Sequence, residues 1–111
     1  MDKLNILWTT DNMETIDNLL TMYTINSKAY GWWQSVNVII WGASAKLIRQ
    51  DKKYQLLVRE MIDSGVKVEA CEACSDNLNA TKKLLELGVD VRYMGEQLTK
   101  YLKDNEIVLT V

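Results

Sequence analysis

The segment Val36-Asn-Val-Ile-Ile-Trp-Gly42 has the features of a short buried β-strand that ends at a glycine. A helical stripe follows, with apolar side chains at i, i+3, i+4, i+7 and i+8: Tyr54, Leu57, Val58, Met61 and Ile62. Gly65 stands where this helix is expected to end, and a second strand-like run covers residues 66–70. A strand, a helix and a strand joined by short loops indicate a βαβ unit and therefore a parallel sheet.

The same alternation covers the rest of the chain. Strands are predicted at residues 4–8, 89–93 and 107–111, and helices at 16–23, 84–87 and 96–103, with a short helical turn at 45–48 and a polar connection at 71–79. In the last helix, Leu98, Tyr101 and Leu102 are expected to face inward. The sequence thus predicts one domain, residues 1–111, with a three-layer α/β/α fold and a five-stranded parallel sheet of flavodoxin or Rossmann type. These patterns do not fix the order of the strands.

The composition excludes several classes of function. The chain of 111 residues has a net charge of −2, and its lysine pairs fall on predicted helix surfaces beside acidic residues, which argues against nucleic-acid binding. No apolar run reaches the roughly 18–20 residues of a membrane helix, and no secretory signal is visible, so we expect a cytoplasmic protein. The chain has no histidine, which removes Ser-His-Asp and Cys-His catalytic units and leaves too few ligands for a zinc site. We expect no metal and no cofactor.

In a parallel sheet, reactive groups gather where the carboxyl ends of the strands meet. Candidate pocket residues at this edge follow the first four predicted strands: Thr10, Asp11, Asn12, Trp41, Ser44, Cys71, Cys74 and Met94. Asp11 or Asn12 is expected to cap the first helix rather than to help hold a flavin phosphate, because the loop contains no glycine. We expect Ser44 to cap the next helical turn.

The two cysteines are the strongest nucleophiles of the chain. Cys71 directly follows a predicted strand and Cys74 lies three residues later, a spacing within reach of a disulfide. This pair permits a thiol-disulfide centre, although the chain lacks the proline that faces such a motif in thioredoxins. It also permits two inert core thiols, or a sulfur nucleophile that carries a persulfide. We expect Cys71 to be the reactive residue, with its thiol open to solvent at the strand edge.

Two neighbouring tryptophans, Trp32 and Trp33, fall in a predicted connection. Adjacent aromatic side chains cannot both be buried easily on one side of a loop. Aromatic residues are enriched at protein interfaces, so we expect both to contribute to a contact between subunits of a homo-oligomer.

Three motifs together resemble the DsrE/DsrF-like family. They are Trp41-Gly-Ala-Ser-Ala-Lys-Leu, Gly65-Val-x-Val-x-Ala-Cys71-x-Ala-Cys74-x-Asp76, and Gly88-Val-Asp-Val-Arg-Tyr-Met94-Gly-x-x-Leu98-Thr-x-Tyr101-Leu-Lys103. The resemblance spans nearly the whole chain and is closest to a small, uncharacterised branch of the family, related to TusD-like sulfur-relay proteins. It implies a five-stranded parallel α/β/α domain, assembly into trimers or hexamers, and a cysteine after the third strand that carries sulfur as a persulfide. Cys71 matches that position.

The resulting hypothesis is a cofactor-independent persulfide carrier, resembling a sulfurtransferase but without true turnover, that exchanges sulfur with donor and acceptor proteins. The relay proteins do not generally have the second cysteine, so Cys74 points to a resolving thiol or to a different acceptor. Two alternatives remain open. One is a binding module for a small ligand or a protein, in which the cysteines are incidental. The other is a thiol-disulfide redox protein.

Overall fold

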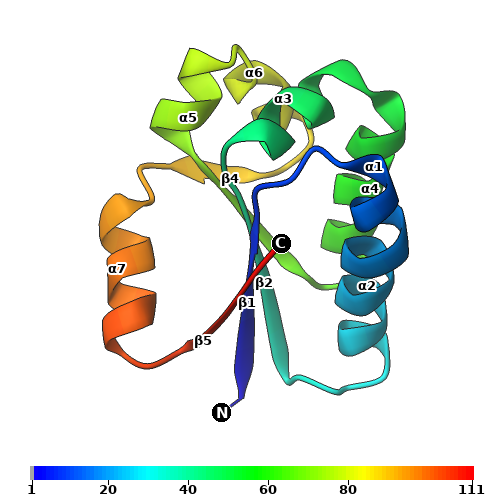
Figure 1. The fold of residues 1–111 in the computed structure, drawn as a ribbon, viewed down its shortest axis with the longest axis vertical. Coiled ribbons are helices and arrows are strands. Elements are labelled where there is room, and N and C mark those ends of the chain that lie inside the picture. Colours follow the sequence, from blue (N-terminus) through cyan, green and yellow to red (C-terminus); the bar gives the residue numbers. More distant parts are fainter. Residues whose placement is uncertain (1) are drawn as a thin grey trace.

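The computed structural model, which describes residues 2–111, contains one sheet of five parallel strands (Figure 1). The strands are β1 (Lys3–Trp8), β2 (Ser35–Ile40), β3 (Lys67–Cys71), β4 (Asp90–Arg92) and β5 (Ile107–Thr110). Their order is β4-β3-β2-β1-β5, with β2 paired to both β1 and β3. The predicted five-stranded parallel sheet with helices on both faces is confirmed.

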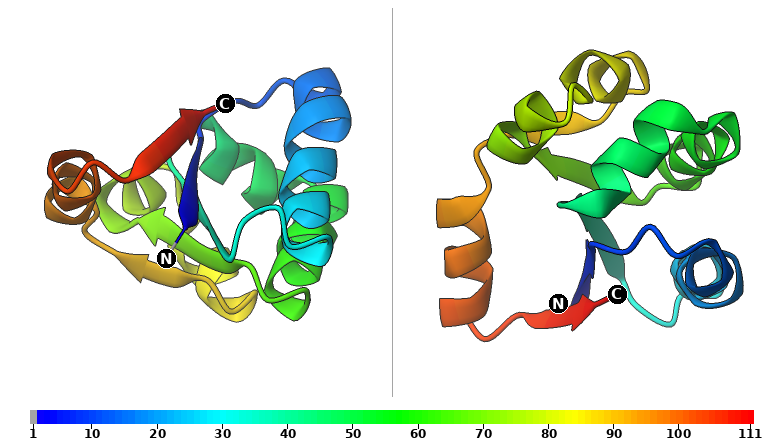
Figure 2. Two further views of the ribbon diagram at one scale, coloured as in Figure 1. Left: turned by 90° about the horizontal axis from the view of Figure 1, so that it is seen from below. Right: turned by 45° about the horizontal axis from the view of Figure 1, so that its top comes forward.

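This strand order explains why the two faces of the sheet are covered unequally. The steps from β1 to β4 all move in one direction, so right-handed crossovers place their helices on the same face. The return from β4 to β5 crosses the opposite face. Helix α7 (Gly95–Lys103) therefore lies by itself on one side of the sheet, whereas α2 (Thr21–Ala29) and α4 (Lys52–Asp63) lie on the other (Figure 2).

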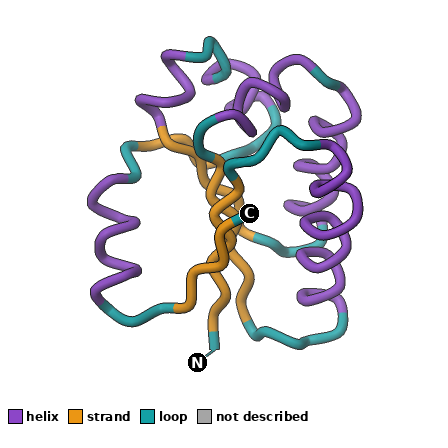
Figure 3. The backbone as a smooth tube through the Cα atoms, in the orientation of Figure 1, coloured by secondary structure: helices purple, strands orange, loops and turns teal. Residues whose placement is uncertain are grey.

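The short helices gather beyond the carboxyl ends of the strands, where the tube in Figure 3 changes from strand to helix within a few residues. Helix α3 contacts α4, α5 and α6 there. The bounds of these helices are α3 (Ala43–Gln50), α5 (Glu72–Asn77) and α6 (Thr81–Glu86). The first crossover begins with α1 (Met13–Thr15) and a π-helical turn, η1 (Ile16–Leu20). No helix within residues 2–111 has the length and apolar character needed to span a bilayer.

The buried apolar side chains form two clusters of different size. The larger one lies between the sheet and the helices α2, α4 and α6, and includes Trp8, Val38 and Met61. The smaller one lies beneath α7; its buried members are Ile39, Cys71, Met94 and Tyr101. Successive side chains of β3 alternate between the two clusters, as strand geometry requires, so Ala70 belongs to the first and Cys71 to the second.

Several local predictions need correction. The polar stretch 71–79 was expected to be a connection, but it contains α5, and the turn predicted at 45–48 extends to the full helix α3. Leu102 was expected to face inward, but it is 55% exposed, because Tyr101 takes the inward position of α7. The expected end of α4 is confirmed: Gly65 follows the helix with a φ of +92°, a conformation that favours glycine.

Candidate functional site

Cys71 lies at the junction of strand and helix. It is the last residue of β3 and the N-cap of α5, and its side chain packs with Ile39, Met94 and Tyr101 in the small cluster beneath α7. The residue is only 6% exposed. The expectation of an open thiol at this position is therefore wrong for the single chain, because Cys71 is buried in a cluster to which Met94 and Tyr101, from the last third of the sequence, also belong.

Cys74 is the more exposed residue of the pair. It is the third residue of α5, it is half-buried, and it packs against both apolar clusters. The backbone N–H of Gly42, at the exit of β2, donates to its Sγ over 3.0 Å. Gly42 has φ +75° and ψ −139°, a backbone conformation that is essentially restricted to glycine. Both cysteines are free thiols.

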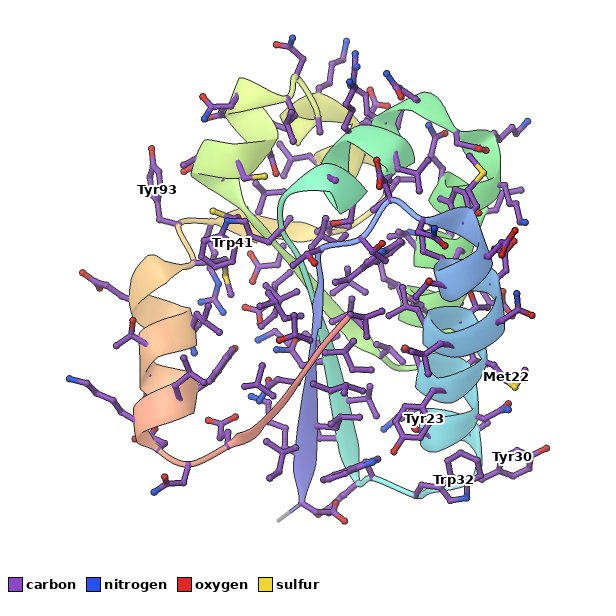
Figure 4. The ribbon with its side chains drawn as sticks, in the orientation of Figure 1. Met22, Tyr23, Tyr30, Trp32, Trp41 and Tyr93 are labelled. Atoms are coloured by element: carbon purple, nitrogen blue, oxygen red, sulfur yellow. The ribbon has the colours of Figure 1, made fainter. Side chains whose placement is uncertain are left out.

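Only some of the other predicted edge residues join the cysteines. Trp41 packs against the small cluster, in which Met94 is fully buried, and Figure 4 shows Trp41 between the end of β2 and α7. Ser44 is sealed inside the fold, where its hydroxyl donates to the carbonyl of Trp8 over 2.6 Å. The prediction that Ser44 caps its helix is wrong, because Gly42 occupies the N-cap position of α3.

The residues that follow β1 belong to the start of α1. Asn12 is the N-cap, and its Oδ1 accepts the backbone N–H of Thr15 over 2.9 Å, which confirms the capping prediction. Thr10 supports this turn by accepting the N–H of Asn12 over 3.0 Å, and Asp11 is exposed. These contacts make Thr10 and Asn12 parts of a helix start.

A buried carboxylate lies two residues before Cys71 on the same face of β3. Glu69 has no solvent exposure, and its Oε1 accepts the hydroxyl hydrogen of Tyr101 over 2.8 Å. Its Oε2 accepts two N–H groups from the guanidinium of Arg92, the Nε at 3.0 Å and Nη2. Lys67 lies farther away, with its Nζ at 3.8 Å from Oε2. Arg92 is paired with Cys71 in the β3–β4 ladder, so this ion pair borders the thiol.

The ionisation of this cluster follows from burial and hydrogen bonding. Burial raises the pKa of Glu69, but the hydrogen bonds from Arg92 and Tyr101 outweigh that effect and hold the pKa below its ordinary value. Burial and the hydrogen bond to Glu69 together raise the pKa of Tyr101 to about 12. At neutral pH, Glu69 is therefore a carboxylate and Tyr101 a neutral phenol that donates to it.

Polar side chains continue from this ion pair across the sheet. Asn37 of β2 donates from Nδ2 to Oδ1 of Asn5 in β1 over 3.0 Å, and Asn5 donates to Glu106 over 3.1 Å. This buried polar row was not predicted from the sequence. Its signal is the recurrence of Asn5, Asn37 and Glu69 in the middle of otherwise apolar strands.

The two tryptophans expected at an interface have different environments. Trp33 packs against the large core, and its Nε1 donates to the hydroxyl of Tyr23 over 3.1 Å. Trp32 is 54% exposed and lies between the rings of Tyr23 and Tyr30, at 6.0 and 5.7 Å between centroids. Figure 4 shows Trp32 and Tyr30 beyond the carboxyl end of α2, with Met22 on the same side of the molecule. We call the exposed residues Met22, Tyr30 and Trp32 the aromatic patch.

A hollow of about 580 Å³ lies away from the cysteines, on the outer surface between η1, α2 and α4. Asp17 lines it and accepts hydrogen bonds from Lys53 at 2.7 Å and from the hydroxyl of Tyr54 at 3.1 Å. The hydrogen bond from Lys53 lowers the pKa of Asp17, so this contact is an ordinary surface ion pair that ties η1 to α4. We therefore keep the cysteine edge as the candidate site.

Solved structures of similar fold come from bacteria and an archaeon. A conserved protein of unknown function, BT1422 from Bacteroides thetaiotaomicron, is 49% identical, with a TM-score of 0.97 over 99% of this chain and 95% of that one. MTH1491 from Methanobacterium thermoautotrophicum, also of unknown function, is 20% identical with a TM-score of 0.76, and the ychN protein from E. coli is 16% identical with a TM-score of 0.71. Both alignments cover the whole of each chain, and at these identities they show the fold alone.

A comparison with curated proteins gives no match. The model of the DsrE/DsrF-like family matches residues 5–111, which is nearly the entire sequence and includes both cysteines, the Glu69–Arg92 pair and α7. The chain belongs to the DsrE/DsrF-like family.

Proposed function

We propose that this protein carries sulfane sulfur as a persulfide on the Cys71–Cys74 pair, as a member of a cytoplasmic sulfur relay. The observation that carries the proposal is the half-buried residue Cys74, whose sulfur accepts the Gly42 N–H, beside the buried residue Cys71. Sulfur relay is the general association of the family, which supports this reading. A reducing compartment keeps thiols free, as this exchange requires.

The proposed exchange needs only thiol chemistry. The thiolate of Cys74 attacks the outer sulfur of a donor persulfide, R–S–SH, and the sulfur–sulfur bond of the donor breaks. The donor thiolate leaves and takes up the proton, and Cys74 holds the outer sulfur as Cys74–S–S⁻. The Gly42 N–H stabilises negative charge on the sulfur of Cys74. An acceptor thiol then takes the outer sulfur by the same exchange, which restores Cys74.

The cysteine that accepts sulfur first in this proposal is not the one expected from the sequence. Cys71 matches the position of the relay cysteine, but Cys71 is buried whereas Cys74 is half-buried, so an external donor meets Cys74 first. We therefore assign acceptance of sulfur to Cys74 and place Cys71 behind it.

Two variants with a single thiol test this proposal. After reaction with glutathione persulfide, intact-mass spectrometry of Cys71→Ser should show a gain of one sulfur atom, and dithiothreitol should remove it. Cys74→Ser should gain far less in the same time. Removal by dithiothreitol matters because two oxygen atoms of a sulfinic acid add nearly the same mass but are not removed.

Two results of this test contradict the proposal. A gain on Cys74→Ser but not on Cys71→Ser would return the acceptor role to Cys71. If neither variant gains a sulfur that can be reduced off, the cysteines are incidental and the binding-module alternative takes the place of the carrier.

The aromatic patch supports homo-oligomerisation, which we propose as part of the functional state. Trp32 and Tyr30 are exposed in the single chain. Tryptophan and tyrosine are enriched among the residues that contribute most of the binding energy at protein interfaces, so their exposure indicates a contact surface. The patch carries no formal charge, so a second copy of the chain can cover it without like-charge repulsion. Exposed Ile107 and Leu109 on the edge strand β5 add uncovered apolar surface.

Size-exclusion chromatography with light scattering tests the assembly. We expect the native protein to form a trimer or a hexamer, and Trp32→Ser to raise its dissociation constant by about thirtyfold or more, as for a hot-spot residue. Tyr93→Ser is the matched control, because Tyr93 is also exposed but lies at the opposite end of the molecule (Figure 4). A native protein that stays monomeric, or equal effects of the two variants, contradicts the assignment of this surface.

A further inference from the structure

We infer that Cys71 resolves the persulfide formed on Cys74, so that the protein releases sulfide and closes a Cys71–Cys74 disulfide. The inference rests on the proposed function, because it starts from a persulfide on Cys74. It adds an activity to that of a carrier: the bound sulfur is reduced and leaves as sulfide instead of passing to another protein thiol.

The chain geometry places the two cysteines on one helical turn. Cys71 is the N-cap of α5 and Cys74 its third residue, and the hydroxyl of Ser75 donates to the carbonyl of Cys71 over 2.7 Å, which fixes this turn. Side chains three residues apart on a helix are neighbours, with Cβ atoms about 5–6 Å apart. A disulfide needs Cβ atoms about 3.5–4.5 Å apart, so the turn must bring the two Cβ atoms closer by about 1–2 Å before the bond can form.

The two cysteines differ in burial, and this difference assigns them different roles in the reaction. Cys74 is half-buried and packs against the small cluster of which Cys71 is a buried member. A donor from solution therefore reaches Cys74 first, whereas Cys71 is buried in the small cluster against which Cys74 packs. A neighbouring group in the same molecule attacks at a high effective concentration. The recessed thiol is thus suited to react with the persulfide and poorly suited to accept sulfur directly.

The reaction is balanced without a metal or an added oxidant. The Cys71 sulfur attacks Sγ of the Cys74 persulfide, the bond between Sγ and the outer sulfur breaks, and the Cys71–Cys74 bond forms. The outer sulfur leaves Cys74–S–S⁻ and takes the proton of the Cys71 thiol, which gives hydrosulfide, HS⁻. The two thiol sulfurs are oxidised and the sulfane sulfur is reduced. A dithiol reductant of the thioredoxin class, or dithiothreitol in vitro, must then reduce the disulfide before a second cycle.

The test compares the native protein with Cys71→Ser, each in excess over glutathione persulfide. The native chain should release one sulfide per donor molecule and lose the mass of two hydrogen atoms, and dithiothreitol should restore it for a second cycle. Cys71→Ser should retain one added sulfur and release no sulfide beyond that of the thiol-free double variant, Cys71→Ser with Cys74→Ser. Cys71→Ala should behave in the same way, which separates the missing thiol from any effect of a buried hydroxyl.

The outcomes separate the inference from the proposed function. A stable added sulfur on the native chain, without sulfide, overturns the inference and leaves the carrier intact. The absence of any added sulfur on Cys71→Ser overturns the assignment of sulfur acceptance to Cys74, and its absence on both single-thiol variants overturns the carrier itself. Diamide gives a readout that does not depend on the carrier: it should oxidise the native pair to a disulfide, and two thiols that still alkylate after diamide would overturn the inference.

Discussion

Replacing Arg92 by methionine should destabilise the fold by about 3 kcal/mol at pH 7, because it leaves the buried carboxylate of Glu69 without its main counter-charge. Methionine keeps much of the aliphatic stem of arginine, so the loss reports on the charge more than on packing. The partial exposure of Arg92 does not reduce this cost, since the group left uncompensated is the fully buried Glu69. Urea unfolding of the two proteins gives the difference.

The pH dependence of the stability difference between the native protein and Arg92→Met shows whether the charge of Glu69 causes that difference. In the native protein the pKa of Glu69 is lowered, so its stabilising contribution is complete above the unfolded value near 4.5 and is lost as the pH falls through the folded pKa. In Arg92→Met the pKa of Glu69 should rise, so the variant loses stability as the pH rises above that unfolded value. The difference between the two proteins should therefore be large at pH 7 and small near pH 4. An equal difference at both pH values contradicts the account.

Lys67→Met is the matched control for this prediction. It removes one positive charge from the same carboxylate, but Lys67 is more exposed and lies at 3.8 Å. Exposed ion pairs contribute about 0–1 kcal/mol, so we expect a loss in that range with little dependence on pH. A loss of stability as large as that of Arg92→Met would mean that the cost comes from removing any positive charge near Glu69, and not from breaking the ion pair with Arg92.

Replacing Gly42 by alanine should cost about 2 kcal/mol and slow the loading of sulfur on Cys74. An added Cβ would lie 3.9 Å from the carbonyl oxygen of Thr9, so the cost comes from the backbone conformation and not from a clash. As the backbone relaxes, the Gly42 N–H moves away from Sγ of Cys74. Loss of one hydrogen bond to a charged sulfur should lower the loading rate about tenfold.

Gly95→Ala is the control for Gly42→Ala. Gly95 is the first residue of α7, its φ is not positive, and an added Cβ meets no atom within 4 Å. This variant should be neutral or slightly stabilising, by less than about 1 kcal/mol, and should load sulfur at the native rate. Urea unfolding measures the change in stability, and the rate of mass gain measures the loading of Cys74 when each glycine variant is combined with Cys71→Ser. The role of Gly42 is contradicted if the two alanine variants behave alike.

The fold class could be predicted because its signals are local. Apolar runs that end at Gly42, Gly65 and Gly88 mark the βα units within windows of a few residues. Helix α5 was missed because the stretch 71–79 lacks an apolar stripe; it is held instead by contacts with α3 and α6. The unequal covering of the sheet depends on the strand order, which no local pattern specifies.

The position of the site could be predicted, but its environment could not. The Cys-x-x-Cys spacing and the end of β3 are visible in the sequence. The burial of Cys71 depends on Met94 and Tyr101, which lie 23 and 30 residues farther along the chain. Glu69 lies two residues before Cys71, and the neutralisation of its charge by Arg92 of β4 could not be predicted from a local pattern. Trp33 was expected at an interface, but its contact with Tyr23 depends on how the connection after α2 folds back.

The central claim, that Cys74 accepts sulfane sulfur, is tested most directly by cyanolysis of the loaded Cys71→Ser protein. Cyanide removes the outer sulfur of a persulfide as thiocyanate, which is measured by its colour with ferric iron. The account predicts one thiocyanate per chain for Cys71→Ser and none for the variant that lacks both cysteines. No thiocyanate from Cys71→Ser after reaction with glutathione persulfide would contradict it.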